Sequence, residues 1–287
     1  MIYSIANITV EFTGDRASDV TSMDRFTPFK TELPSSQIKI DVSSEHYDFD
    51  TSTPLYFLAY DNTEFSFHLS SQNEYLYRLY NTETKSIFCI RHFLGTNLAE
   101  IKGDGDINML IFATWVAYGI TVLKYNRVPI HTSTIEYGGK GVMFLGESGT
   151  GKSTHTRLWR ENIEGARLLN DDSPVIEATD EGIFVYGSPW SGKTPCYKQQ
   201  KAELKGIVRL SQAPYNKIKH LNIIESFTAL YPSCPPSFAH NEVLSDGVCS
   251  FVSKILKQIK VYHLECLPDA AAAQLSFNTI IGEGISK

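Results

Sequence analysis

Paired cysteines are missing from this chain of 287 residues. The cysteines are odd in number and widely spaced, and none lies in a Cys-x-x-Cys pair. His220, His240 and His263 also lack the short spacing of zinc ligands. A disulfide framework and a zinc site are therefore excluded, and we expect the cysteines to be small buried hydrophobic residues. They are Cys89, Cys196, Cys234, Cys249 and Cys266.

A net positive charge is also missing. The chain has 26 Lys and Arg residues against 32 Asp and Glu residues, which gives a formal net charge of −6 at pH 7. Proteins that bind duplex nucleic acid carry a positive field over the binding surface. We therefore expect no nucleic-acid partner.

No apolar run reaches the ~20 residues that a helix needs to cross a bilayer. The most apolar stretch, residues 109–123, contains Thr114, Gly119 and Thr121. It predicts a buried helix, and we expect no membrane partner. The first residues lack the basic region, apolar run and cleavage site of a secretory signal, so we expect a cytoplasmic location.

What the chain does contain is enough apolar sequence for a sizeable core, since 42% of its residues are hydrophobic and 12% are aromatic. Alternating apolar and polar residues predict strands at 38–42, 65–69 and 75–80. The polar segment 13–36 predicts a long loop.

After about residue 104 the sequence pattern changes and predicts a mixture of helices and strands. We expect an α/β fold with a mixed sheet, in which a β-rich N-terminal region spans residues 1–103 and a second domain spans residues 104–287. Strands are predicted at 130–137, 141–145, 166–170, 175–178, 183–186, 206–210 and 260–265, and helices at 152–160, 223–230, 242–259 and 269–280.

The strongest motif is a glycine-rich loop. The sequence GESGTGKS at residues 146–153 fits G-x-x-x-x-G-K-[ST], after an apolar strand pattern and before a helical one. This context is typical of a phosphate-binding loop, whose backbone N–H groups and following helix N-terminus bind phosphates. Lys152 is then expected to reach the β- and γ-phosphates of ATP, and the Ser153 hydroxyl to bind Mg²⁺. The alternative is a glycine-rich hairpin that ends in Lys-Ser.

Two acids follow the loop closely. Asp171 and Asp172 end a short apolar strand that is separated from the loop by one predicted helix, so we expect them beside the loop at the end of the sheet. One acid of such a pair can hold Mg²⁺ while the other accepts a proton from an attacking hydroxyl. The alternative is a solvated Asp-Asp turn before Ser173 and Pro174.

These residues resemble the superfamily of HPr kinase/phosphorylase and ATP-dependent phosphoenolpyruvate carboxykinase. His131, on the strand before the loop, corresponds to an active-site histidine that faces the acid pair in HPr-kinase-like proteins; an ordinary strand histidine is the alternative. The resemblance runs from about residue 130 to the C-terminus and includes residues 187–193, 202–208 and 262–269.

The resemblance implies a phosphate-binding-loop domain of the carboxykinase-like and HPr-kinase-like type, and it implies roles for individual residues. Asp172 would hold Mg²⁺ with Ser153, and Asp171, assisted by His131, would be the general base. Lys193 would contact phosphate or substrate, unless it is an ordinary solvated lysine. ATP would be bound by Gly146, Glu147, Ser148, Gly149, Thr150, Gly151, Lys152, Ser153 and Thr154.

The sequence departs from both named enzymes. It lacks the glycine-rich, acid-containing stretch with which true HPr kinases handle their protein substrate, and it lacks the Arg and Lys set that carboxykinases use for a dicarboxylic acid. The expected function is an ATP- and Mg²⁺-dependent kinase that acts on a hydroxyl of a peptide serine or a small metabolite. The alternatives are a non-catalytic nucleotide-binding regulatory or accessory module and a slow ATPase. The resemblance also implies a homo-oligomer.

Overall fold

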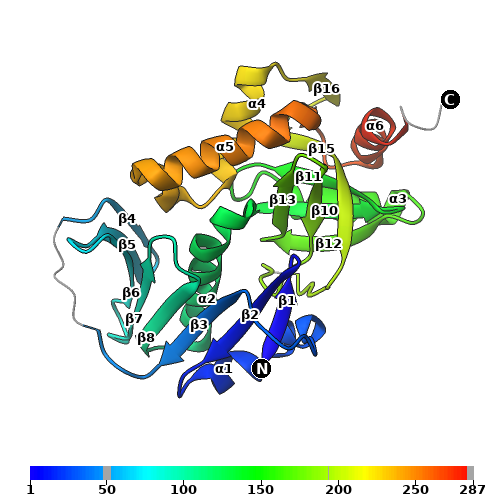
Figure 1. Cartoon of the computed structure of the whole chain (residues 1–287). Coiled ribbons are helices and arrows are strands. Elements are labelled where there is room, and N and C mark those ends of the chain that lie inside the picture. Colours follow the sequence, from blue (N-terminus) through cyan, green and yellow to red (C-terminus); the bar gives the residue numbers. More distant parts are fainter. Residues whose placement is uncertain (48–52, 193, 283–287) are drawn as a thin grey trace. The chain divides into compact units, whose positions relative to one another are not determined.

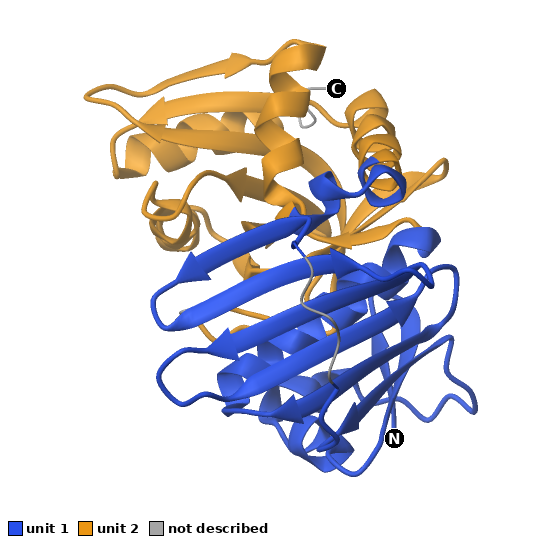
Figure 2. Cartoon of the chain, turned by 90° about the vertical axis from the view of Figure 1, so that its left-hand side faces the viewer, with its two compact units in different colours: residues 1–125, 237–245 blue, residues 126–236, 246–287 orange. Residues whose placement is uncertain are grey.

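The computed structural model describes residues 1–47, 53–192 and 194–282 and has a mixed α/β fold with two mixed sheets (Figure 1). The chain forms two compact units (Figure 2). The first contains residues 1–125 and 237–245, and the second contains residues 126–236 and 246–287. The expected α/β class is thus present.

The first unit is built on an eight-stranded sheet in the order β1-β2-β3-β8-β7-β6-β5-β4. The pairs β2–β3 and β3–β8 are parallel and the other pairs are antiparallel. Three strands confirm the predicted alternations at 38–42, 65–69 and 75–80. The strands are β1 (Ile2–Ile5), β2 (Ile8–Thr13), β3 (Ile38–Ser43), β4 (Tyr56–Tyr60), β5 (Thr63–Leu69), β6 (Glu74–Asn81), β7 (Ile87–Phe93) and β8 (Leu98–Asp104).

The apolar stretch predicted as a buried helix is α2 (Ile107–Val122), which packs on β7 and β8 of this sheet. It therefore belongs to the first unit, although the sequence placed the boundary between the domains before it, at residue 104. Together with the following 3-10 turn it spans residues 107–125, long and apolar enough for a membrane span, but it is mostly buried, as a core helix is. Asp106 caps its N-terminus by accepting hydrogen bonds from Asn108 N and Met109 N.

The segment 13–36, predicted as a loop, contains short helical elements instead. These are α1 (Ala17–Thr21) and a 3-10 helix (Asp24–Phe29). Val20, Phe26 and Phe29 are buried. Because polar residues surround these three apolar residues, the segment shows no apolar periodicity from which the helical turns could be predicted.

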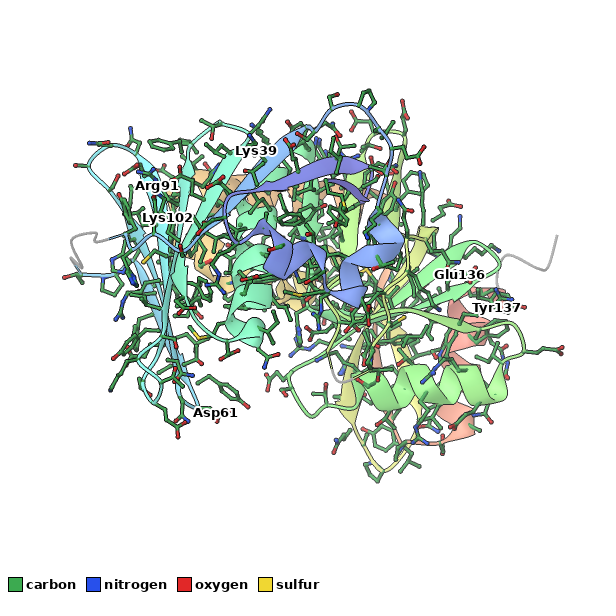
Figure 3. All side chains as sticks on the ribbon, turned by 90° about the horizontal axis from the view of Figure 1, so that it is seen from below. Lys39, Asp61, Arg91, Lys102, Glu136 and Tyr137 are labelled. Carbon is green, nitrogen blue, oxygen red and sulfur yellow. The ribbon has the colours of Figure 1, made fainter. Side chains whose placement is uncertain are left out.

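Some charged side chains on the first sheet are paired, either with a neighbouring strand or with the segment after β3. Arg91 on β7 lies opposite Glu100 on β8 and donates to its carboxylate over 2.6 Å, while Lys102 bonds Glu45 over 2.7 Å. Arg91 and Lys102 are labelled on this sheet in Figure 3. These pairs stabilise the sheet surface locally.

The second unit contains a nine-stranded sheet, in which β12-β10-β11-β15-β14-β13-β9 lie in order and β17 pairs with both β15 and β16. The pairs β11–β15 and β15–β17 are parallel. The strands are β9 (Arg127–Pro129), β10 (Thr132–Tyr137), β11 (Lys140–Leu145), β12 (Arg167–Asp172), β13 (Val175–Thr179), β14 (Gly182–Tyr186), β15 (Lys201–Gln212), β16 (Lys217–His220) and β17 (Val261–Cys266).

Four helices accompany this sheet at the positions that the sequence predicts. They are α3 (Lys152–Asn162), α4 (Ile223–Leu230), α5 (Glu242–Gln258), whose residues 242–245 count with the first unit, and α6 (Ala270–Ile280). Short 3-10 helices span Leu123–Tyr125, Tyr231–Ser233 and Pro236–His240.

The core that fixes the loop lies under α3 and α6. Trp159 of α3 is fully buried and packs edge-on against Phe144 of β11 and Phe277 of α6. Glu136 accepts a hydrogen bond from Gly139 N over 2.6 Å and so closes the β10–β11 hairpin; Figure 3 labels Glu136 at the end of β10. Packing of Phe144 on Trp159 therefore holds the loop-proximal end of β11 against α3, and the hairpin fixes the other end of β11.

Candidate functional site

The glycine-rich loop connects β11, which ends at Leu145, to α3, which begins at Lys152. This is the strand, loop and helix order that the sequence predicts. Gly146, Gly149 and Gly151 all have positive φ angles, a conformation that side-chain-bearing residues avoid. A Cβ atom at Gly146 would lie only 2.4 Å from Thr150 Oγ1. The backbone of the loop therefore depends on glycine at these positions.

Lys152 folds its side chain back along the loop. Its Nζ donates to Gly146 O over 2.7 Å and to Glu147 O over 3.3 Å. Burial lowers the pKa of Lys152, while the charges of Asp172 and Asp171 act in the opposite direction. The half-buried ammonium and the N-terminus of the helix both supply positive charge at the same point. This arrangement suits a bound polyphosphate.

Asp171 lies beside this loop, as expected from the sequence. Ser153 Oγ donates to Asp171 Oδ1 over 3.0 Å and to Oδ2 over 3.2 Å. The side chain of Asp171 is buried, and its neighbour Ser133 on β10 lies opposite it in the sheet. The hydroxyl and the carboxylate thus meet where the loop enters α3.

Asp172 pairs with His131, whose Nδ1 lies 3.1 Å from Asp172 Oδ1. The expected contacts are therefore exchanged, because the sequence analysis placed Asp172 with Ser153 and Asp171 with His131. Successive strand residues tend to face opposite sides of a sheet, and here the two adjacent acids make different hydrogen-bonding contacts. Both Asp172 and His131 are about half exposed, at 42% and 49% of their side-chain surface, so a solute can reach them.

Asp172 also has a φ of 121°, which is rare for a residue other than glycine. The segment after Tyr186 supports this conformation, since Gly192 N and Ser191 Oγ both donate to Asp171 O, over 2.6 and 3.0 Å. Unusual backbone angles of this kind concentrate at functional sites, where the surroundings hold them in place.

Asn170 and Ser188 support the acid pair from within the core, a role that the sequence analysis missed. Asn170 Nδ2 donates to Trp190 O over 3.1 Å, and Asn170 Oδ1 accepts from Ser173 N over 3.0 Å. Ser188 Oγ donates to Ser173 O over 2.6 Å. The signal available in the sequence was an asparagine directly before the two acids in an otherwise apolar strand.

A cavity of about 540 Å³ opens on the side of the loop that faces α3. Thr154 lies on its wall, and Gln212 Nε2 reaches Gly149 O over 3.3 Å at its edge. The apolar part of the wall suits a flat, largely apolar group attached to the phosphates. The lining comprises Gly149, Thr150, Gly151, Thr154, His155, Leu158, Leu210, Gln212, Ala213, Cys266, Leu267 and Pro268.

His155, on the wall of this cavity, is a packing residue. Its Nε2 is hydrogen-bonded to Ser276 Oγ over 3.0 Å, and its ring packs against Phe144. Burial lowers its pKa to about 4, so the ring is neutral at pH 7. It therefore supplies shape to the site and no charge.

The other residues that the sequence predicts to bind ATP belong to the loop itself. Glu147 and Ser148 are exposed at its tip, and Thr150 Oγ1 closes the loop by donating to Glu147 O over 2.8 Å. Lys193 lies outside the described residues, and so does its expected contact with phosphate or substrate.

The described residues contain no metal site formed by protein side chains alone. Across residues 1–47, 53–192 and 194–282, no group of three or more His, Cys, Asp and Glu side chains could hold a metal ion. The magnesium of nucleotide-binding loops needs fewer protein ligands, since one hydroxyl and one carboxylate suffice when phosphates and water complete the shell. The Ser153 and Asp171 pair fits that requirement.

No family model and no curated protein sequence matches this chain, so the likeness to the carboxykinase and HPr kinase superfamily rests on the motif residues themselves.

Proposed function

We propose that this protein is an ATP- and Mg²⁺-dependent phosphotransferase of the HPr-kinase-like type, which moves the γ-phosphoryl group to a hydroxyl of a peptide serine or a small metabolite. The observation that carries the proposal is the hydrogen bond from Ser153 to Asp171 beside a lysine-bearing glycine loop, with the His131–Asp172 pair adjacent. In this proposal the second unit is a phosphate-binding-loop domain and the protein is cytoplasmic.

The nucleotide would bind with its phosphates against the loop. The N–H groups of residues 146–153 and the N-terminus of α3 would hold the phosphate oxygens, and Lys152 would leave Gly146 O to reach the β- and γ-phosphates. Ser153 and Asp171 would hold Mg²⁺, which supplies charge compensation on the phosphates when bound.

Asp172 would then act as the general base. Its exposed carboxylate takes the proton of the acceptor hydroxyl as that oxygen forms a bond to the γ-phosphorus and the bond to the β-phosphate oxygen breaks. His131 holds the Asp172 carboxylate in position through Nδ1. Lys152 balances the charge that develops on the departing ADP oxygen. These roles exchange the two acids relative to the expectation from sequence.

The test is transfer of label from γ-labelled ATP. The protein is incubated with Mg²⁺ and a host-cell extract separated into peptide and small-molecule fractions, beside Lys152→Ala and Asp172→Asn. Label in one fraction, absent with both variants, is the expected result and identifies the acceptor class. Label found only in inorganic phosphate would identify an ATPase instead. Nucleotide binding without any turnover would identify a nucleotide-binding accessory module.

A further inference from the structure

Three basic residues form a row across three neighbouring strands of the second unit. Arg209 on β15 is the register partner of His263 on β17, and His263 is the partner of Lys219 on β16. Directly opposed residues in a sheet share one face, so the three side chains stand side by side. This face is opposite to the one on which Leu210 and Leu264 join the core under α3 and α6.

The row lines a cavity of about 470 Å³ that also touches the glycine-rich loop. Gly146 and Glu147 form the loop side of this cavity, and Glu225 and Thr228 of α4 form another wall. A smaller cavity of about 210 Å³ shares Gly146, Glu147, Arg209 and Thr228 with the first, and His131 lines it. The two cavities therefore lead from the basic row past the loop to His131, whose Nδ1 lies 3.1 Å from Asp172 Oδ1.

The charges in this row are only partly compensated by the protein. Like charges that face each other across strands are unfavourable. Lys219 Nζ lies 3.4 Å from Glu225 Oε1, but within residues 1–47, 53–192 and 194–282 no carboxylate lies at ion-pair distance from Arg209. Burial lowers the pKa of His263, and the neighbouring Lys219 and Arg209 lower it further, against the charge of Glu265.

We propose that this cavity binds the anionic group of a small phosphoryl acceptor, a carboxylate or a phosphate monoester, and directs a hydroxyl of the same molecule toward Asp172. The inference rests on the proposed function and adds the class of acceptor to it. A guanidinium binds planar and tetrahedral oxyanions with paired hydrogen bonds, and a neighbouring ammonium adds charge. The size of the cavity is that of a small-molecule site.

Binding of defined probes tests this inference. D-Glycerate carries a carboxylate, sn-glycerol 3-phosphate carries a phosphate monoester, and glycerol, with a third hydroxyl in place of the anionic group, is the neutral control. Each is titrated by calorimetry into the full chain saturated with Mg²⁺ and ADP, while the imidazole resonances of ¹⁵N-labelled histidine report on His263. We expect saturable binding of at least one anion, a shift of the His263 signals, and no binding of glycerol.

Three charge variants locate the binding. Arg209→Gln and Lys219→Gln should each weaken anion binding by roughly tenfold, the size of one charge-assisted hydrogen bond. Lys217→Gln is the matched control, because it removes the same charge from the same strand two residues away and Lys217 does not line the cavity. The affinity of Lys217→Gln for the anions should equal that of the unaltered chain. The affinity for ADP should be the same in all four proteins.

The inference is overturned if neither anion binds saturably, if Arg209→Gln and Lys219→Gln bind as the unaltered chain does, or if Arg209→Gln weakens ADP binding equally. The last outcome would assign the row to the nucleotide. Label transfer to the same three probes is measured in parallel on the same proteins, with Mg²⁺ and γ-labelled ATP in place of ADP. Anion binding without transfer supports the cavity and counts against the proposed kinase, whereas transfer to glycerol as fast as to the anions supports the kinase and overturns the cavity.

Discussion

Ser153 and Asp171 meet through a hydrogen bond of 3.0 Å at the point where the glycine-rich loop becomes α3. The contact joins the first turn of a helix to the end of β12, and β10 lies between β12 and the strand that leads into the loop. It therefore places a buried carboxylate beside the phosphate-binding backbone, while the following carboxylate, Asp172, stays accessible next to His131. The two acids are consequently expected to behave differently when altered.

Exchange of each acid for its amide separates metal binding from proton transfer. Asp171→Asn should weaken the binding of a non-hydrolysable ATP analogue with Mg²⁺ by about tenfold or more, because the metal loses its charged protein ligand. Asp172→Asn should keep that affinity within about twofold and abolish transfer, because the amide cannot take a proton. Calorimetry with and without Mg²⁺ measures the first effect. The reverse pattern would restore the assignment expected from the sequence.

Gly146→Ala tests the conformation of the loop. The φ of Gly146 is +155°, and an added Cβ would lie 2.4 Å from Thr150 Oγ1, so the loop must shift. We expect the affinity for the ATP analogue to fall by about tenfold or more. Gly139→Ala is the control, because Gly139 also has a positive φ but lies in the β10–β11 turn with open space around its Cα. Gly139→Ala should lower the free energy of unfolding without lowering the affinity for the ATP analogue.

The sequence predicted the loop and the closeness of the acids because both depend on local order. A glycine-rich turn between an apolar strand and a helix has few conformations, and one helix returns the chain to the same end of the sheet. Which acid faces Ser153 could not be predicted. That choice depends on the register of Asp171 with Ser133 and on the positive φ of Asp172, and both are set by contacts from residues 191 and 192.

The basic row could not be predicted for a different reason. Arg209, Lys219 and His263 come from three separate strands, and only the pairing of β15, β17 and β16 brings them together. β16 is a four-residue strand with the sequence KIKH, too short and too polar for its alternation to stand out. The helical turns within residues 13–36 were not predicted because they are also short and mostly polar, with only a few buried residues to anchor them.

Asn170→Ala tests the support of the acid pair. The substitution leaves Ser173 N without its side-chain partner inside the core and removes one of the two side-chain donors to the carbonyl of Trp190, the other being Ser188 Oγ. Buried polar groups left in this way cost about 1–3 kcal/mol. We expect a lower urea midpoint by tryptophan fluorescence and reduced transfer at unchanged nucleotide affinity. Asn162→Ala is the control, since Asn162 only donates to Leu158 O at the exposed end of α3. If both variants unfold alike, the network does not support the site.

His155 predicts how stability changes with pH. Its pKa is about 4 in the folded protein, below the ordinary value of 6.5, because burial disfavours the charged ring. Below pH 6.5 the unfolded chain therefore takes up a proton that the folded chain resists. The contribution of His155 is complete above pH 6.5 and is lost as the pH falls toward 4. At pH 5 the loss from this residue is about 2 kcal/mol.

The measurement is urea unfolding at pH 8 and at pH 5 for the unaltered chain and for His155→Gln. Glutamine retains a donor for Ser276 but has no proton to gain, so the loss of stability between the two pH values should shrink by about 2 kcal/mol in the variant. His220→Gln, at an exposed strand end, should retain the full pH dependence. An equal loss of stability between pH 8 and pH 5 in the two variants would mean that His155 is accessible to protons in the folded protein. The wall of the cavity beside α3 would then be open to water at that point.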